Sequence, residues 1–487
     1  MGQEGLGVNC PTPNTLFSVF LGLLHALIVG ILQLYWLSDK ELNAYFNKMT
    51  QLTAQNIRST FTRLRPRSAW SFRHVERREM NAFTHGYHRY PAKFIPQIVQ
   101  QLIKDYAPTG DEIICDPFGG CGTTLVEAKI SGRKSVAFDI NPIAKLITQV
   151  KITPIRPSLL EKYREDFLGN YTKVKARKNF AKRHPRIGYW FDENTIEELD
   201  KIYLAIKKIR NDKVKKFFLC AFSHNLKNCS RWLMKSIKPT IDKKKIIQDP
   251  KTSFLRHLNS MIKKNHVFYD KLVETSNLRT PANMYRRDST QRLPLEDSSI
   301  DLIITSPPYV TSYEYADLHQ LSLLWFGDDQ SHFKKWDKFA ESFNDFRSQF
   351  VGTSYKQEKK GILDSVIGNK IVESLALTDK SLASDVANYF LDMKKVFSEM
   401  HRILKAGGKA CVIVGNTNLR GVEILNAEVA VEQMSKLGFK KVDFIKREIS
   451  NKMITPWRDK NTGKFTSLSN PEKMRVYEFE YVVVMEK

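Results

Sequence analysis

The sequence predicts an α/β fold with a doubly wound, mostly parallel sheet, a basic and mainly helical insert, and an apolar helix at the N-terminus. A strand, a glycine-rich loop, a helix and a second strand follow one another between residues 112 and 138 and indicate the first half of the sheet. Strand patterns return only after residue 300 and indicate the second half. With 487 residues, 42% of them hydrophobic, the chain is long enough to bury a large core around such a sheet.

Residues 1–48 form an apolar N-terminal segment. Its core, LFSVFLGLLHALIVGILQLYWL at residues 16–37, is long enough to cross a bilayer. The residues before it contain Glu4 and no Lys or Arg, so the positively charged start of a secretory signal peptide is missing. Three interpretations stay open: a membrane anchor, a helix buried against another part of the protein, or a segment read from an upstream start codon with Met49 as the working start. If the segment spans a membrane, the arginines within residues 58–67 place the rest of the chain in the cytoplasm.

The chain is strongly basic. It carries 77 Lys and Arg against 52 Asp and Glu, a formal net charge of +25, which favours a polyanionic partner such as nucleic acid or an anionic membrane surface. Residues 151–250 hold 25 basic and 11 acidic side chains, so this stretch alone supplies +14. A solvated helical face is the alternative to nucleic-acid contact there. The six cysteines have no zinc-finger or C-x-x-C spacing, which predicts neither a metal site nor a disulfide framework and suits a reducing cytoplasm.

The first structured region is predicted at residues 49–150. An Arg-rich leading segment is followed by an entry helix and then by the first βαβ unit. The predicted elements are a helix at 96–106, a strand at 112–115, a helix at 123–130 and a strand at 135–138.

The basic insert is predicted at residues 151–280 and the second half of the sheet at residues 281–487. In the insert, FDENTIEELDKIYLAIKKIR has the pattern of an amphipathic helix capped at Asn194 or Thr195. The later strands are predicted at 300–304, at 409–415 after a helix ending at KAGG, and in a closing antiparallel pair, VDFIKREIS and YEFEYVVVME.

The loop CDPFGGCGTT, residues 115–124, leads from the first strand into the next helix. Its glycines let the backbone turn tightly and come close to a ligand. Asp139 ends the second strand, where a carboxylate can accept hydrogen bonds from both ribose hydroxyls of a nucleoside. The loop lacks the Lys-Ser/Thr pair of a P-loop, which argues against a nucleoside triphosphate. Because Asp116 lies beside the turn, a cationic cofactor fits better than a pyrophosphate.

The strand at 300–304 runs directly into the pentapeptide TSPPY, residues 305–309. Two consecutive prolines stop a strand because each lacks an N–H and fixes φ. They also leave the carbonyls of Ser306 and Pro307 free of the sheet. A simple strand stop followed by a surface tyrosine is one interpretation, but the glycine-rich loop upstream favours a functional site at this end of the sheet.

These motifs resemble those of the amino-directed DNA methyltransferases. CDPFGGCGTT is similar to their S-adenosylmethionine loop, TSPPY to their catalytic motif in the form associated with the 4-amino group of cytosine, and HGYHRYPAKF, residues 85–94, to a segment that folds over the methionine moiety. The resemblance covers residues 81–487 without the insert. It implies a seven-stranded Rossmann-like methyltransferase sheet, S-adenosylmethionine as cofactor, double-stranded DNA as substrate, and leaves a cognate restriction endonuclease open as a partner. The cofactor-binding residues that it suggests are Asp116, Pro117, Phe118, Gly119, Gly120, Gly122, Thr123, Asp139, Asp288, Lys93 and Phe94.

The resemblance also implies that Ser306, Pro307, Pro308 and Tyr309 are catalytic. An aromatic amine is a poor nucleophile because its lone pair is delocalised into the ring. Two acceptors, Ser306 Oγ and the carbonyl of Pro307, would favour a pyramidal nitrogen, and the prolines would orient that carbonyl before reaction. Tyr309 would stack on a cytosine flipped out of the duplex.

Several other functions stay open or are excluded. Methylation of cytosine carbon 5 needs a Cys nucleophile after the proline, and this loop has none. Adenine N6 methylation is the closest alternative, although family members with that target usually carry Asp or Asn in place of Ser306. A non-catalytic DNA-binding specificity subunit and a membrane-tethered, lipid-binding protein are further alternatives. Either the insert or residues 317–387 could be the region that recognises DNA.

Overall fold

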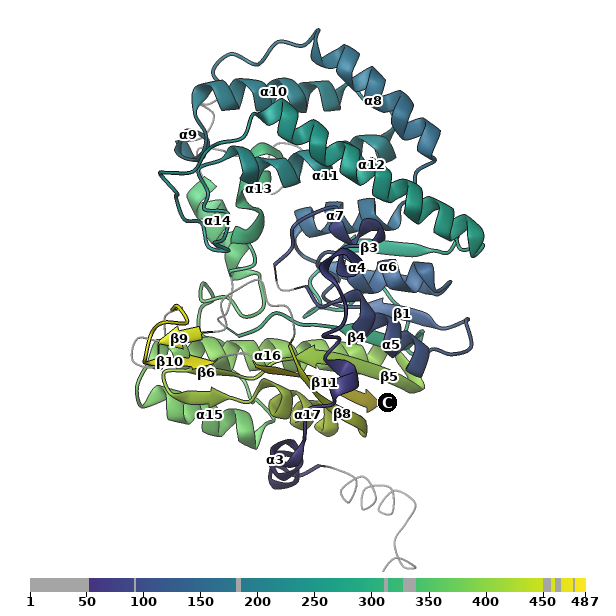
Figure 1. Cartoon of the computed structure of the whole chain (residues 1–487). Coiled ribbons are helices and arrows are strands. Elements are labelled where there is room, and N and C mark those ends of the chain that lie inside the picture. Colours follow the sequence, from purple (N-terminus) through teal and green to yellow (C-terminus); the bar gives the residue numbers. More distant parts are fainter. Residues whose placement is uncertain are drawn as a thin grey trace, which may run out of the picture. The chain divides into compact units, whose positions relative to one another are not determined.

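A seven-stranded sheet organises the chain in this computed structural model (Figure 1), with the strand order β3-β2-β1-β4-β5-β11-β8. Strands β3, β2, β1, β4 and β5 pair in parallel, and β11 runs antiparallel to both β5 and β8. The α/β class and the mostly parallel sheet are therefore as predicted. The strands are β1 (Ile113–Asp116), β2 (Lys134–Asp139), β3 (Ala282–Arg286), β4 (Ile300–Thr305), β5 (Leu404–Val414), β8 (Lys440–Glu448) and β11 (Phe479–Glu486). The structure describes residues 52–91, 93–180, 185–310, 314–326, 339–449, 457–459, 466–475 and 478–487.

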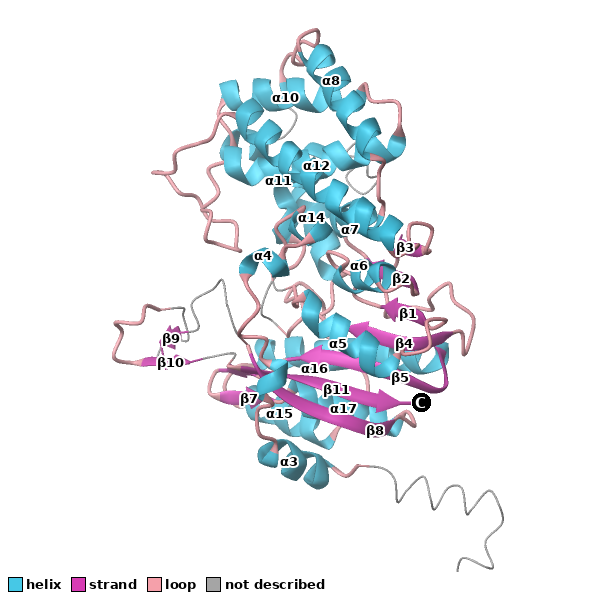
Figure 2. Cartoon of the chain, turned by 45° about the vertical axis from the view of Figure 1, so that its right-hand side comes forward, coloured by secondary structure: helices cyan, strands magenta, loops and turns pink. Residues whose placement is uncertain are grey.

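Helices cover both faces of the sheet (Figure 2). Successive side chains of a strand point to opposite faces, so Ile114 and Leu302 pack towards α5 (Pro96–Tyr106) while Cys115 and Ile303 pack on the opposite face. Strands buried on both faces have almost continuous apolar sequences, which is why β1 and β4 could be located from sequence. The other helices against the sheet are α6 (Thr123–Ile130), α7 (Pro142–Ile152), α3 (Ala54–Arg63), α16 (Lys380–Ile403) and α17 (Asn426–Lys436), and α15 (Val366–Ala376) packs against α16 and α17.

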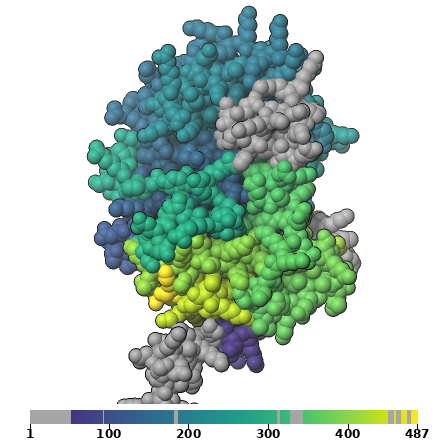
Figure 3. Space-filling model, turned by 180° about the vertical axis from the view of Figure 1, so that it is seen from behind, coloured from purple at the N-terminus to yellow at the C-terminus, as the bar shows by residue number. Residues whose placement is uncertain are grey.

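A helical lobe combines the insert with two helices that come much later in the chain (Figures 1 and 3). Trp325, after the TSPPY motif, packs its ring against Phe180 and Phe222 of the insert, at centroid distances of 4.7 and 5.5 Å. The insert and the beginning of residues 317–387, our two alternatives for the recognition region, therefore share one hydrophobic core. The lobe consists of α8 (Pro157–Tyr171), α9 (Pro185–Trp190), α10 (Glu193–Lys207), α11 (Asp212–Cys229), α12 (Pro250–Glu274), α13 (Gln320–Phe326) and α14 (Phe339–Ser348).

Short elements complete the described part of the chain. They are α4 (Arg77–Met80), the 3₁₀ turns η1 (Ser68–Trp70), η2 (Phe83–Gly86) and η4 (Asp317–His319), and two hairpins, β6 (Thr417–Leu419) with β7 (Val422–Ile424) and β9 (Trp457–Asp459) with β10 (Lys473–Arg475).

Two local predictions were wrong. The N-cap of α10 is Asp192, which accepts a 2.8 Å hydrogen bond from the backbone N–H of Thr195, so the helix begins before Asn194. The KAGG stretch does not end a helix, because α16 ends at Ile403 and KAGG already belongs to β5. The chain terminus holds KAGG in the sheet: Gly407 N donates to the carbonyl of Lys487, and Lys487 N donates to the carbonyl of Gly408, both at 3.0 Å.

The apolar stretch at residues 16–37 lies outside the described residues, so all three interpretations of it stay predictions. Among the helices that are described, none combines the length and hydrophobicity needed to cross a membrane.

Candidate active site

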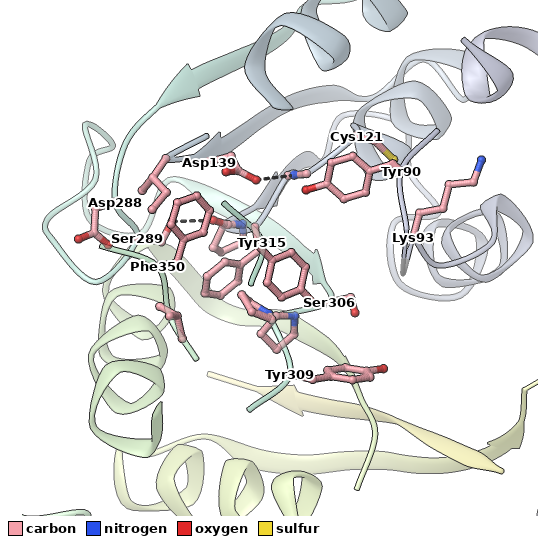
Figure 4. Close-up of a pocket in the computed structure, with 18 of the residues that line it drawn as sticks. Tyr90, Lys93, Cys121, Asp139, Asp288, Ser289, Ser306, Tyr309, Tyr315 and Phe350 are labelled. Carbon is pink, nitrogen blue, oxygen red and sulfur yellow. Dashed lines mark hydrogen bonds between the residues drawn. The ribbon is translucent and has the colours of Figure 1, made fainter. Parts of the chain in front are cut away.

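A cavity opens at the carboxyl ends of β1, β2 and β4, where α/β sheets bind ligands. It holds about 880 Å³ of empty space, including space open to solvent. Figure 4 shows its lining, which comes from several separate stretches of chain. The predicted site residues that line it are Lys93, Phe94, Pro117, Phe118, Gly119, Gly120, Thr123, Asp139, Asp288, Ser306, Pro307, Pro308 and Tyr309.

Asp139, the last residue of β2, binds the glycine-rich loop through its side chain. Its Oδ2 accepts a 3.0 Å hydrogen bond from Gly120 N and its Oδ1 accepts a 2.8 Å bond from Asn141 N. Burial raises the pKa of this carboxyl to about 6. Each carboxylate oxygen can accept more than one hydrogen bond, so acceptor capacity remains for the hydroxyls of a ligand in the cavity.

Two glycines bring the loop backbone close to its neighbours. A Cβ at Gly119 would lie 2.8 Å from the Cβ of Ala137, and a Cβ at Gly120 would lie 3.2 Å from the hydroxyl of Tyr90. Gly120 also has a φ of +47°, which L side chains rarely adopt. The loop is therefore held between β2 and Tyr90, with its backbone forming one wall of the cavity.

Asp116 and Gly122 lie behind that wall and do not line the cavity. Asp116 is buried, and its two oxygens accept hydrogen bonds from Phe118 N at 3.0 Å, Thr305 Oγ1 at 2.7 Å and Thr124 Oγ1 at 2.8 Å. Burial raises its pKa to about 6. Gly122 caps α6 in the left-handed conformation, with φ of +77°. Both residues shape the loop, and neither is placed to touch a ligand in the cavity.

Thr305 of the TSPPY motif is the last residue of β4, and Ser306 and the two prolines that follow it line the cavity. The ring of Tyr309 packs on Gly415, where an added Cβ would lie 3.6 Å from it. Its hydroxyl donates a 3.3 Å hydrogen bond to Glu480, which is paired with the buried Arg447. Burial raises the pKa of Tyr309 well above its usual value. Figure 4 shows Ser306 and Tyr309 on the side of the cavity opposite Asp139.

The side chains of Lys93, Phe94 and Asp288 also line the cavity but differ in their direction and in their partners. Lys93 directs its ammonium away from it (Figure 4), donating to Asn81 Oδ1 at 3.2 Å and to the carbonyl of His85 at 3.1 Å, and burial lowers its pKa to about 8. Phe94 also packs against the core on the α5 face of the sheet. Asp288 accepts bonds from the N–H and the hydroxyl of Thr290, at 2.9 and 2.8 Å, as in an Asx turn.

Several lining residues were not among the predicted site residues. Tyr90 lies inside the HGYHRYPAKF segment, whose Lys93 and Phe94 were predicted to bind the cofactor. The same segment could therefore have predicted Tyr90 as a lining residue. Gln349, Phe350 and Val351 come some forty residues after the TSPPY motif, and no sequence pattern connects them to the cavity. The others are Cys121, Ile140, Arg287, Ser289 and Tyr315. Across the described ranges, no three His, Cys, Asp or Glu side chains are grouped as metal ligands.

The sequence of the chain matches a family model and is similar to several known proteins. A family model described as DNA methylase matches residues 33–149 and 300–487, on either side of the insert and β3. The type II methyltransferase M.MvaI of Kocuria varians is 27% identical over 407 residues, which cover 78% of this chain and 87% of that protein. The type II methyltransferase M.BsoBI of Geobacillus stearothermophilus is 23% identical over 412 residues, covering 74% of this chain and 80% of that protein.

Two solved structures are also similar to parts of the chain. A putative DNA modification methylase of Thermus thermophilus, solved with S-adenosyl-L-methionine, is 17% identical and covers 40% of this chain and 50% of that one, with a TM-score of 0.18. A SAM-dependent methyltransferase of Methanosarcina mazei is 11% identical and covers 82% of this chain and 98% of that one, with a TM-score of 0.27. The family model alone matches more than half of the chain. The protein therefore belongs to the DNA methylase family.

Proposed function

We propose that this member of the family transfers a methyl group from S-adenosylmethionine to the exocyclic 4-amino group of cytosine in double-stranded DNA, as the modification enzyme of a type II restriction-modification system. One observation carries the proposal: Asp139 and Ser306, predicted for the cofactor and for the target base, line a single cavity. Had they opened onto separate cavities, no methyl group could pass between their ligands.

The cavity residues fit S-adenosylmethionine. Asp139 offers acceptor capacity for the ribose hydroxyls, and the backbone of Gly119 and Gly120 lines the cavity next to it. The buried carboxyls of Asp139 and Asp116 favour a cation nearby. When bound, S-adenosylmethionine supplies an electrophilic methyl group on its sulfonium. Asp288 and Phe118 line the same cavity and would contact the nucleoside.

The TSPPY motif provides the acceptors for the target amine. Ser306 Oγ and the carbonyl of Pro307 would accept hydrogen bonds from its two N–H groups, which opposes delocalisation of the nitrogen lone pair into the ring. The following Pro308 has no N–H and a fixed φ, so the carbonyl of Pro307 is oriented before the base arrives and little reorganisation is needed during transfer.

Tyr309 would hold the flipped base by stacking. Base-aromatic stacking contributes about 1 to 3 kcal/mol per base, comparable with the few kcal/mol that flipping costs. The contacts of the ring with Gly415 and of its hydroxyl with Glu480 already fix its orientation, which lowers the entropy cost of stacking.

Mass spectrometry of nucleosides from DNA of cells that express the protein tests this function. We expect N4-methylcytosine, and none in cells that express the Asp139→Ala variant at equal level. N6-methyladenine in its place would favour the adenine alternative. DNA binding without any methylated nucleoside and without affinity for S-adenosylmethionine would favour the non-catalytic specificity subunit.

A further inference from the structure

Residues 231–246, within the loop between α11 and α12, form a concentrated basic surface that we call the rim loop. It contains six Lys and Arg residues and one acid, Asp242. Four of its lysines are exposed: Lys235, Lys238, Lys243 and Lys244. Within the described ranges, no salt bridge pairs any of these four ammonium groups with a carboxylate, so their charge faces solvent.

Hydrogen bonds brace the rim loop from within. Trp232 and Ile241 form an antiparallel bridge, and Leu233 N donates to the carbonyl of Thr240 at 2.8 Å. The ammonium of Lys245 donates to the carbonyls of Trp232 and Lys227, at 2.9 and 2.5 Å. These contacts fix the backbone that carries the exposed lysines. A fixed array of charges loses less conformational entropy on binding a partner than a flexible tail of the same charge.

The rim loop is attached on one side to the segment that carries the cavity residue Tyr90. It begins two residues after the end of α11, and Asn228 in the last turn of α11 accepts a 2.6 Å hydrogen bond from Arg89. Arg89 precedes Tyr90, whose side chain lines the cavity.

The rim loop is attached on its other side to the chain that follows the TSPPY motif. Arg231 N donates to the carbonyl of Trp190 at 2.8 Å, and the rings of Trp190 and Trp232 stack at 5.2 Å. The indole N–H of Trp190 donates to Gln320 at the start of α13, at 3.3 Å. Short chains of contacts therefore connect the rim loop to the residue before Tyr90, which lines the cavity, and to α13, which follows the TSPPY motif in the chain. In Figures 1 and 2 it lies on the same side of the molecule as hairpin β9-β10.

We propose that the rim loop binds the phosphate backbone of the DNA that flanks the target base. The proposal rests on the proposed function. The insert and residues 317–387 were the two alternatives for the region that recognises DNA, and the proposal assigns phosphate contacts to one surface within the insert. Phosphate contacts from lysines hold the duplex in register without reading its sequence. A braced loop joined to the cavity residue Tyr90 and to α13 would therefore hold the duplex next to the cavity and raise DNA affinity.

Replacing the four exposed lysines by glutamine tests the proposal. The variant K235Q/K238Q/K243Q/K244Q should bind a cognate duplex at least about tenfold more weakly at 150 mM salt. The slope of log K against log salt should become shallower by about 0.9 for each phosphate that the variant no longer neutralises. Affinity for S-adenosylmethionine and the single-turnover methylation rate at saturating DNA should stay unchanged, because the lysines do not line the cavity.

The matched control replaces four exposed lysines elsewhere, Lys134, Lys395, Lys436 and Lys440. Lys134 and Lys440 begin strands, and Lys134 thus lies at the end of the sheet opposite the cavity. Equal effects of both variants on affinity and salt slope would overturn the proposal, since only net charge would matter. Unchanged DNA binding with loss of binding to vesicles containing anionic lipid would also overturn it. Absence of methylation by the unmodified protein would instead contradict the proposed function.

Discussion

The hydroxyl of Thr305 donates a 2.7 Å hydrogen bond to Oδ1 of Asp116, and both side chains are buried. Thr305 ends β4 immediately before Ser306, and Asp116 ends β1 immediately before the glycine-rich loop. The same carboxylate also accepts from Thr124 in the first turn of α6. One buried carboxylate therefore joins the loop assigned to the cofactor to the loop assigned to the target base. Asp116 is a positioning residue for both.

Loss of this bond should weaken methyl transfer more than cofactor binding. Thr305→Val keeps the side-chain shape but leaves the buried Asp116 with one donor fewer, which should lower the free energy of unfolding by about 1 to 3 kcal/mol. Single-turnover methylation should fall, while calorimetric affinity for S-adenosylmethionine should change less. Thr305→Ser keeps the hydroxyl, so its single-turnover methylation rate and its affinity for S-adenosylmethionine should be close to those of the unmodified protein. If Thr305→Val kept the single-turnover rate of the unmodified protein, the hydrogen bond between Thr305 and Asp116 would have no role in methyl transfer.

Cofactor affinity should depend on pH through Asp139. Because burial raises its pKa to about 6, the carboxyl is largely ionised at pH 7.5 and largely protonated at pH 5. A ligand that donates hydrogen bonds to the carboxylate favours the ionised form, so affinity should be constant above pH 7 and decrease as the pH falls through 6. Calorimetry between pH 5 and 8 measures this. In Asp139→Asn, affinity should be weaker and the decrease should become smaller, with only the part due to the buried Asp116 remaining. A decrease of unchanged size would mean that Asp139 does not cause it.

The close contact between Gly120 and Tyr90 predicts a specific rescue. Gly120→Ala places a Cβ 3.2 Å from the Tyr90 hydroxyl. Residue 120 has a φ of +47°, and for alanine this left-handed conformation costs about 1 to 2 kcal/mol. Cofactor affinity should fall, measured by calorimetry. Tyr90→Phe removes the hydroxyl, so the double variant should regain part of the loss. No gain in the double variant would mean that backbone strain alone explains the defect.

Tyr309 should act on the base and not on the cofactor. Tyr309→Ala removes the stacking surface and should reduce methylation severely, with affinity for S-adenosylmethionine largely intact. Tyr309→Phe loses only a 3.3 Å hydrogen bond to Glu480 and should retain most of the activity. If alanine lowered methylation and cofactor affinity equally, the ring would be structural.

The hydroxyl of Ser306 should contribute to the transfer step itself. Ser306→Ala removes one of the two proposed acceptors, so we expect a single-turnover rate about tenfold to a hundredfold lower, with a smaller change in DNA affinity. Rapid-quench measurements with pre-bound DNA separate the two effects. An unchanged rate constant would leave the carbonyl of Pro307 as the acceptor.

Local signals were reliable where one short stretch of sequence fixes the conformation. Residues 96–106 and 123–130 are helical as predicted, since Pro96 opens one helix and the glycine-rich loop opens the other. The prediction failed at KAGG, where two adjacent glycines indicate a helix end. There, pairing with the chain terminus extends β5. Tertiary hydrogen bonds thus overrode a local preference.

The sequence by itself determined the α/β class, the two loops that open onto the cavity and most of its lining, because buried strands, tight turns and proline stops depend on neighbouring residues. The tertiary structure alone decided that Asp116 holds two loops together, that Phe350 completes the cavity, and that the insert shares a core with α13 and α14. These relationships join residues far apart in the chain. They arise from packing and hydrogen bonding in the folded protein, which no local pattern encodes.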